Sequence, residues 1–180
     1  DYLDFAHIPV GVLSQAYELY LRNHAPIRQR KEGGFYTPRP IADLMVRSSL
    51  AALSIEGNAF KAKILDPSAG AGVFLLTAFR ELVAERWKYD GVRPSTEALR
   101  EILYNQIVGF DINEAALRFS ALGLYLMSIE LDAEPRPVDK LKFKNLRDNV
   151  LLKMTTEEKI SGQNLGSLGS LVGKEHINQY

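Results

Sequence analysis

An acidic residue and two glycines follow a short apolar run at residues 64–72, Ile-Leu-Asp-Pro-Ser-Ala-Gly-Ala-Gly. This order of residue types predicts a buried strand that ends at Asp66, then a turn, then a helix from Val73 to about Lys88. Gly70 and Gly72 have no Cβ, so the turn can adopt positive φ and bring a ligand close to the main chain at the helix N-terminus. The turn is therefore a candidate ligand-binding loop.

The charge at this turn indicates which ligands it suits. The dinucleotide-binding fingerprint G-x-G-x-x-G would require a glycine at position 75, which is Leu75. The carboxylate of Asp66 would also repel a pyrophosphate. It favours a cationic or zwitterionic ligand instead, such as S-adenosylmethionine, which carries an ammonium group and a sulfonium group.

A second apolar run, residues 107–111, also ends in an acid, Asp111. A carboxylate at the tip of a second strand offers two acceptors to the vicinal hydroxyls of a ribose, so we expect Asp111 to bind a ribose. Asp111 follows Asp66 by 45 residues, whereas about 20 are usual, so an insertion is expected between the two strands. The insertion is predicted to contain a helix capped by Ser95, with Leu99, Ile102 and Leu103 on one face.

Three motifs follow one another along the chain: Tyr36-Thr37-Pro38, the Asp-Pro-x-x-Gly-x-Gly loop of residues 66–72, and Gly-Phe-Asp-Ile-Asn at residues 109–113. In this order they resemble the motif set of N6-adenine DNA methyltransferases, and most of all that of the large type I and type IIG restriction-modification enzymes. Residues 13–21 also resemble the helix that precedes the Tyr-Thr-Pro segment in that family. The resemblance covers roughly residues 10–150.

The resemblance implies an α/β, Rossmann-like methyltransferase fold with three layers and a mainly parallel sheet, preceded by a helical segment. It also implies that S-adenosylmethionine is the cofactor. The Tyr36 to Pro38 segment would close over the amino-acid end of the cofactor, the 66–72 turn would surround its methionine portion, and Asp148 would lie near its adenine amine. The implied cofactor-binding residues are Tyr36, Thr37, Pro38, Asp66, Ser68, Ala69, Gly70, Gly72, Asp111, Ile112 and Asp148.

One motif of that family is absent, since the chain has no Asn-Pro or Pro-Pro dipeptide. In the family, an Asn/Asp-Pro-Pro-Tyr/Phe motif after the fourth strand holds the flipped target adenine. We therefore expect no catalytic residue here, and expect residues 1–35 to be an N-terminal helical segment, 36–155 the cofactor-binding front part of a longer enzyme, and 156–180 a flexible Gly/Ser-containing connector. The fourth strand would pair with the first, so we expect the first-strand edge to be open and to favour self-association.

Composition is that of an ordinary globular domain, with 46% hydrophobic and 24% charged residues and no cysteine. We expect a cytoplasmic protein without a disulfide, metal site, signal peptide or membrane span. The net charge is zero, but basic residues gather in two places and could contact the phosphates of DNA, although a solvated surface is the more usual role of such runs. These are Arg22, Arg28, Arg30, Lys31, Arg39 and Arg47, and then Arg136, Lys140, Lys142, Lys144, Arg147 and Lys153.

The remaining pattern predicts the elements around the two acids. Apolar spacing predicts a helix over residues 12–21, and Thr37 is expected to cap a helix whose first residue is Pro38. Asn113 is expected to cap a helix that is apolar nearly all round and therefore buried between layers, and residues 141–146 are expected to form a third strand at a sheet edge. The inward face of the helix after Thr37 is expected to carry Leu44, Met45, Ser48 and Ala52.

Several functions remain open on the sequence. A same-fold RNA or protein methyltransferase would differ at the target-binding motif, which this chain does not contain. A degenerate nucleoside-binding or protein-docking module would keep the fold without catalysis, and Leu75 disfavours a nicotinamide-dependent dehydrogenase. In the methyltransferase reading, the expected partners are DNA and specificity or restriction subunits or domains.

Overall fold

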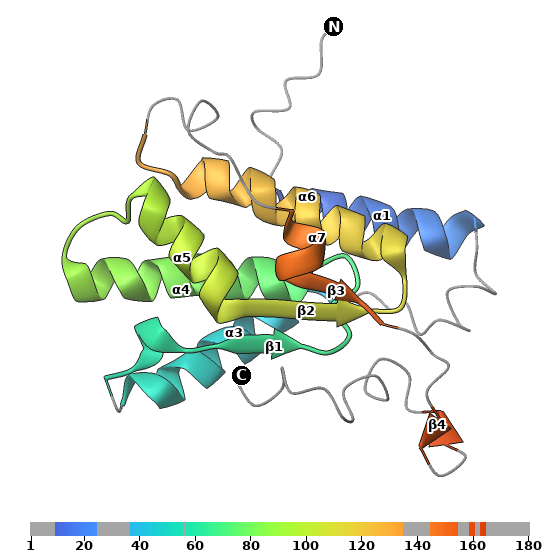
Figure 1. The fold of residues 1–180 in the computed structure, drawn as a ribbon, viewed down its shortest axis with the longest axis horizontal. Helices are drawn as coiled ribbons and strands as arrows, with labels where there is room; N and C mark the ends of the chain where they lie inside the picture. The colour runs from blue at the N-terminus through green and yellow to red at the C-terminus, as the bar shows by residue number, and fades with distance from the viewer. Residues whose placement is uncertain are drawn as a thin grey trace, which may run out of the picture.

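A computed structural model describes residues 10–24, 37–55, 57–134 and 145–154, together with the short strands β4 (Lys159–Ile160) and β5 (Gln163–Asn164). Three parallel strands form the central sheet in the order β1 (Ile64–Asp66), β2 (Ile107–Asp111), β3 (Leu151–Lys153) (Figure 1). Asp66 is level with Gly109, and Asp111 is level with Lys153. Within the described residues β1 is thus one edge of the sheet and β3 the other.

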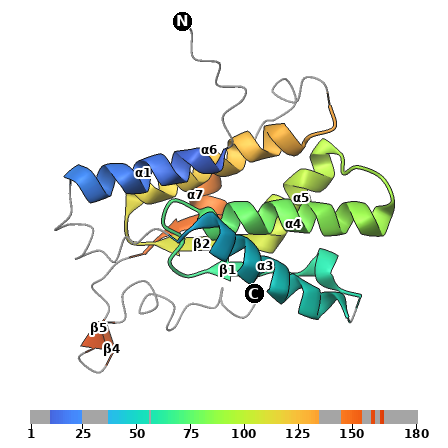
Figure 2. The same ribbon diagram turned by 180° about the vertical axis from the view of Figure 1, so that it is seen from behind.

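Helices surround this sheet in chain order. They are α1 (Gly11–His24), α3 (Arg39–Ser54), the 3₁₀ turn η2 (Ala59–Lys61), α4 (Val73–Asp90), α5 (Thr96–Gln106), α6 (Glu114–Leu131) and α7 (Leu146–Asn149). The strands are joined through α4, α5 and α6, as parallel strands require. Figure 2 shows α1, α3 and α4 together on the near side of the molecule.

The main hydrophobic core lies between one face of the sheet and these helices. Ile107 of β2 and Leu151 of β3 are fully buried there against residues such as Phe79 of α4 and Leu124 of α6. The opposite face carries a smaller apolar cluster, made only by residues in or directly after the strands: Leu65, Val108, Phe110, Ile112, Leu152 and Met154. No described helix contributes to that second cluster, so the described residues make two of the three expected layers.

Several sequence predictions are confirmed. The Ser95 hydroxyl accepts a hydrogen bond from the Ala98 N–H at 3.3 Å, and the Asn113 side chain accepts from the N–H groups of Ala115 and Ala116. Both residues therefore cap their helices. The helix after Asn113 is covered on its outer side by α1, where the rings of Tyr17 and Phe119 lie 4.5 Å apart. The inserted helix buries Leu99, Ile102 and Leu103 as expected.

The prediction for the start of α3 is wrong. Pro38 occupies the N-cap position with ψ 132°, no side chain caps the helix, and Pro40 stands in its first turn. Because the ψ of Pro38 is 132°, Pro38 lies outside the helix, which begins at Arg39, two residues after Thr37.

The predicted inward face of α3 is also wrong. Leu44 and Met45 are 63% and 53% exposed, and Ser48 and Ala52 are exposed too. Asp43 and Arg47 instead face α4 and bond to Thr77 and Glu81. These polar contacts turn the stripe formed by Ala42, Val46 and Leu50 toward the core.

The third strand lies further along the chain than predicted. Residues 141–144 lie outside the described residues, and Leu146 begins α7. The strand at the sheet edge is β3, because the apolar run Val150-Leu151-Leu152 places Val150 and Leu151 in the core. Trp87, near the end of α4, is 48% exposed. Among the described helices, none combines the length and apolarity needed to cross a bilayer.

Candidate functional site

The loop after β1 runs beside the carboxyl end of β2. The Ala69 N–H donates to the carbonyl of Phe110 at 2.8 Å, and the Gly70 N–H donates to the Asp111 carboxylate at 2.8 Å. These two bonds extend the pairing of β1 with β2 into the loop. They bring six predicted site residues together at the carboxyl end of the strands, which is where open α/β sheets bind ligands. These residues are Asp66, Ser68, Ala69, Gly70, Gly72 and Asp111.

Asp111 accepts hydrogen bonds at the carboxyl end of β2 through both of its carboxylate oxygens. Oδ2 accepts from the Gly70 N–H at 2.8 Å, and Oδ1 accepts from the Asn113 N–H at 2.7 Å. A carboxylate offers about four lone-pair sites, so each oxygen keeps capacity for a second donor. Asp111 can therefore fix the glycine loop and still accept hydrogen bonds from a ribose.

Backbone conformation and close packing both require glycine in this loop. Gly70 and Gly72 have φ of 53° and 88°, the left-handed region that other residues rarely adopt. A Cβ on Gly72 would lie 2.3 Å from the hydroxyl oxygen of Ser120 on α6. Gly72 is thus required by the helix packed behind the loop as well as by its own conformation.

Ser120 and Gly109 support the loop, and neither was among the predicted site residues, although Gly109 opens the motif of residues 109–113. Ser120 is fully buried, and its hydroxyl donates to the Gly70 carbonyl at 3.2 Å. A Cβ on Gly109 would lie 2.5 Å from Leu75 and 3.1 Å from Ala69, so this glycine lets the loop and α4 approach β2. A polar residue on the buried face of an apolar helix was the available signal for Ser120.

Asp66 is held differently from Asp111. Its Oδ1 accepts from the Ser68 N–H at 3.0 Å, whereas its Oδ2 is buried and has no hydrogen-bond partner. Burial raises the pKa of Asp66 above its usual value of 3.8, the Ser68 hydrogen bond opposes this, and the nearby charge of Asp111 adds to the rise. A buried carboxylate oxygen without a donor is a position where a cationic group of a ligand would be stabilised.

The other predicted site residues are not shown to join this group. Tyr36 lies outside the described residues, and Thr37 and Pro38 precede α3. Ile112 directly follows Asp111 and packs in the cluster on the opposite sheet face. Asp148 lies in α7 before β3, so its backbone is at the amino end of that strand, whereas Asp111 is level with Lys153 at the carboxyl end.

A cluster of ion pairs borders Asp111 on the β3 side. Glu114, at the start of α6, lies 2.8 Å from Arg118, 2.7 Å from Arg147 and 3.5 Å from Lys153. The hydrogen bond and charge of Arg118, followed by the charges of Arg147 and Lys153, lower the pKa of Glu114. The two residues of the second basic run that the structure describes are therefore drawn to one carboxylate.

The residues present fit an adenosyl cofactor with an amino-acid tail. Asp111 can accept from two vicinal hydroxyls, the glycine turn allows close approach to the main chain, and the buried Oδ2 of Asp66 lacks a donor that an ammonium group would provide. A pyrophosphate would bring negative charge against two carboxylates. The arrangement favours a ligand with positive charge near β1 and hydroxyls near β2.

A parallel sheet with a glycine turn after β1 and an acid at the tip of β2 gives the chain a Rossmann-like methyltransferase fold. The chain belongs to the N-6 DNA methylase family, whose model matches residues 10–156. Over 95 residues it is 34% identical to a putative type II restriction enzyme and methyltransferase of Methanocaldococcus jannaschii; the match covers 50% of this chain and 8% of that protein. No solved structure matches the chain significantly.

Proposed function

We propose that this chain is the S-adenosylmethionine-binding part of a DNA adenine N6-methyltransferase of a restriction-modification system. The observation that carries the proposal is the pair of acids at the ends of β1 and β2. Asp66 has a buried Oδ2 without a donor, and Asp111 is bonded to the glycine turn. The family membership and the name of the M. jannaschii protein support the DNA and restriction-modification parts.

The roles of the residues follow from their chemistry. Asp111 accepts hydrogen bonds from the ribose hydroxyls while it holds Gly70 in place. Asp66 receives the ammonium group of the methionine tail at Oδ2, and the 68–72 turn lies against that tail. Tyr36, Thr37 and Pro38 close over the amino-acid end of the cofactor. Asp148, at the amino end of β3, has no role in this proposal. When bound, the cofactor supplies an electrophilic methyl group.

Methyl transfer is not assigned to residues of this chain, since it contains no Asn/Asp-Pro-Pro-aromatic motif. In the proposal, that motif and the DNA-recognition surface belong to further parts of the enzyme. The match covers a small share of the M. jannaschii relative. We therefore propose specificity and restriction subunits or domains as partners of this chain. We further propose that the first-strand edge supports self-association of the isolated chain, which sedimentation velocity at increasing concentration tests.

Calorimetric titration tests the cofactor proposal. S-adenosylmethionine and S-adenosylhomocysteine are expected to bind and NAD is not, with binding abolished in Asp111→Ala. The matched control is Asp132→Ala, because Asp132 is a buried aspartate at the other end of α6 that bonds to Thr96 and to the Glu134 N–H. Its loss lowers stability without touching the proposed site. Equal binding of NAD, or retained adenosyl binding in Asp111→Ala, contradicts the assignment.

A further inference from the structure

The loop after β1 is held from two sides, by β2 and by α6. The N–H groups of Ala69 and Gly70 donate to the carboxyl end of β2, and the Gly70 carbonyl accepts from Ser120 of α6. Gly72 lies directly on Ser120, because a Cβ on Gly72 would be 2.3 Å from its hydroxyl oxygen. These contacts do not involve the side chain of Ala71, which stands between the two glycines and is only 4% exposed. Another part of the chain therefore covers Ala71.

A helix that precedes the sheet in the chain provides this cover. Tyr17 of α1 forms one buried apolar cluster with Ala71 and with Ala116 of α6. Phe119 packs against this cluster, and its ring centroid lies 4.5 Å from that of Tyr17. Figures 1 and 2 both show α1 lying along α6, the helix that also supports the loop through Ser120. The Tyr17 ring thus connects α1 with the ligand-binding loop.

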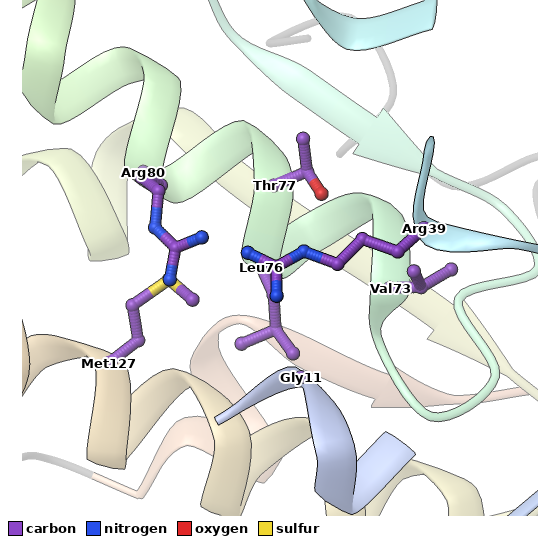
Figure 3. A pocket seen from close by; sticks show the side chains of 7 residues that line it. All are labelled: Gly11, Arg39, Val73, Leu76, Thr77, Arg80 and Met127. Carbon is purple, nitrogen blue, oxygen red and sulfur yellow. The ribbon is translucent and has the colours of Figure 1, made fainter. Parts of the chain in front are cut away.

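Tyr17 is the position at which α1 supports the loop. Among the α1 side chains that the structure describes, Tyr17 is the only buried one. The first residue of the helix, Gly11, instead borders a cavity of about 320 Å³, a volume that includes the open space at its mouth (Figure 3). Val73, which directly follows Gly72, lines the same cavity. The first turn of α1 therefore leaves space beside the end of the loop, and close packing occurs at Tyr17.

The loop needs such support because of its glycines. Gly70 and Gly72 adopt φ of 53° and 88° on either side of Ala71. Glycine loses more conformational freedom on ordering than any other residue, so a loop with two glycines among three residues is held in one conformation chiefly by its contacts. A binding loop that is ordered before the ligand arrives adds less entropic cost to binding. Contacts to Ala71 should therefore raise ligand affinity without touching the ligand.

We propose that Tyr17 is a positioning residue of the cofactor site. Its ring fixes Ala71 and, through the backbone, the neighbouring Gly70. The Gly70 N–H donates to Asp111, the carboxylate assigned to the ribose, so a loosened loop also loosens Asp111. The cofactor part of this inference rests on the proposed function, whereas the order of the loop does not. The site therefore depends on α1, a helix that supplies no cofactor contact of its own in the proposal.

Amide hydrogen exchange measured by NMR tests the positioning role without any ligand. The reporters are the hydrogen-bonded N–H groups of Gly70 and Gly72. Tyr17→Ala is expected to make both amides exchange about tenfold faster relative to Gly109, whose N–H donates to the Val150 carbonyl. Unchanged exchange at the two loop amides overturns the proposal. An equal increase at Gly109 also overturns it, because that result shows a general loss of stability rather than a loosened loop.

Two variants control this result. Tyr20→Ala removes the same type of side chain from the same helix, but Tyr20 is 60% exposed and its ring lies against His24 of α1. Its loop amides should exchange at the wild-type rate, and an increase as large as that of Tyr17→Ala would contradict the assignment. Tyr17→Phe keeps the ring that packs with Phe119 and should behave like wild type. If Tyr17→Phe exchanges as fast as Tyr17→Ala, ring packing is not the cause and the proposal is overturned.

Calorimetric titration with S-adenosylmethionine then connects the loop with the proposed function. Tyr17→Ala is expected to bind about tenfold more weakly than wild type, whereas Tyr20→Ala and Tyr17→Phe should bind with wild-type affinity. If wild type binds and Tyr17→Ala binds equally well, the positioning role is overturned and the cofactor proposal stands. If wild type binds no adenosyl ligand, the cofactor proposal fails, and the exchange experiment still decides the role of Tyr17.

Discussion

The carboxyl ends of β1 and β2 each carry an aspartate, and the two are treated in opposite ways. Asp111 accepts backbone N–H groups on both oxygens, one from the loop after β1 and one from the start of the next helix. Asp66 accepts one N–H on Oδ1 and keeps Oδ2 buried without a partner. Both oxygens of Asp111 are thus hydrogen-bonded within the fold, whereas one oxygen of Asp66 is not.

This difference separates stability from binding. Hydrogen bonds to Asp111 stabilise the fold whether or not a ligand is present, whereas burial of Asp66 costs free energy until a cation approaches. Strained or unsatisfied groups of this kind concentrate at functional sites. Substitutions at the two aspartates should therefore have opposite effects on stability and the same effect on cofactor binding.

The largest effect is expected from Asp111→Ala. Two backbone N–H groups lose their acceptor, which should lower the free energy of unfolding by about 2–3 kcal/mol and the melting temperature by about 5–10 °C. Differential scanning calorimetry measures the change, with Asp132→Ala as the control that loses stability but retains cofactor binding. A variant with wild-type stability would show that the Gly70 and Asn113 bonds to Asp111 are not important in solution.

Asp66→Asn should have the opposite sign on stability. Asparagine keeps an oxygen for the Ser68 N–H and removes the buried negative charge, so the free energy of unfolding at pH 7 should rise by about 1 kcal/mol. S-adenosylmethionine binding should weaken at least about tenfold, because the ammonium group loses its carboxylate. Chemical denaturation and calorimetric titration of the same sample test both parts. A variant that loses both stability and binding would remove the contrast with Asp111.

The pH dependence of binding sharpens the same contrast. Because the pKa of Asp66 is raised in the folded chain, its contribution to stability is present below the unfolded value and is lost as the pH rises through the folded value. An ammonium ligand needs the carboxylate form, so its affinity should fall by up to about tenfold per pH unit below the pKa of Asp66. 5′-Methylthioadenosine, which lacks the amino-acid group, should show a much flatter profile, and identical profiles would contradict the role of Asp66.

The smallest effect is expected at Ser120. Ser120→Ala removes the 3.2 Å hydrogen bond to the Gly70 carbonyl and keeps the Cβ that packs on Gly72. Stability should fall by about 1 kcal/mol, and cofactor affinity should fall with it by about threefold as the loop loosens. Ser128→Ala is the matched control, because Ser128 is buried on the same helix and bonds only within it, to the Leu124 carbonyl at 2.8 Å. If both variants reduce affinity equally, the loop contact is not the cause.

Local patterns predicted the elements that carry the site. The strand that ends at Asp66, the strand that ends at Asp111, and the caps at Ser95 and Asn113 all lie where residue types placed them. Each depends on interactions between residues a few positions apart, so the sequence around it contains the needed information.

The wrong predictions concern the buried face of α3 and the position of the third strand, where the sequence pattern allowed two alternatives. Both sides of α3 carry apolar residues. Asp43 accepts a hydrogen bond from Thr77 of α4 and Arg47 donates one to Glu81, and these contacts decide that Leu50 is buried while Leu44 is exposed. The third strand was placed at a weak alternation before Leu146, whereas burial of Val150 and Leu151 against the core selects β3. Neither choice is encoded in spacing alone.

By itself, the sequence determined which residues could form the site: a carboxylate before a glycine turn, a second carboxylate at a strand end, and the order of both along the chain. Only the tertiary structure decided that Asp111 accepts the Gly70 N–H and that the Ser120 hydroxyl donates to the Gly70 carbonyl. It also decided that Asp66 has a buried oxygen without a donor. The physical reason is that hydrogen-bond satisfaction and burial depend on residues up to 50 positions apart, whose proximity arises only when the parallel strands pair and α6 packs against the loop.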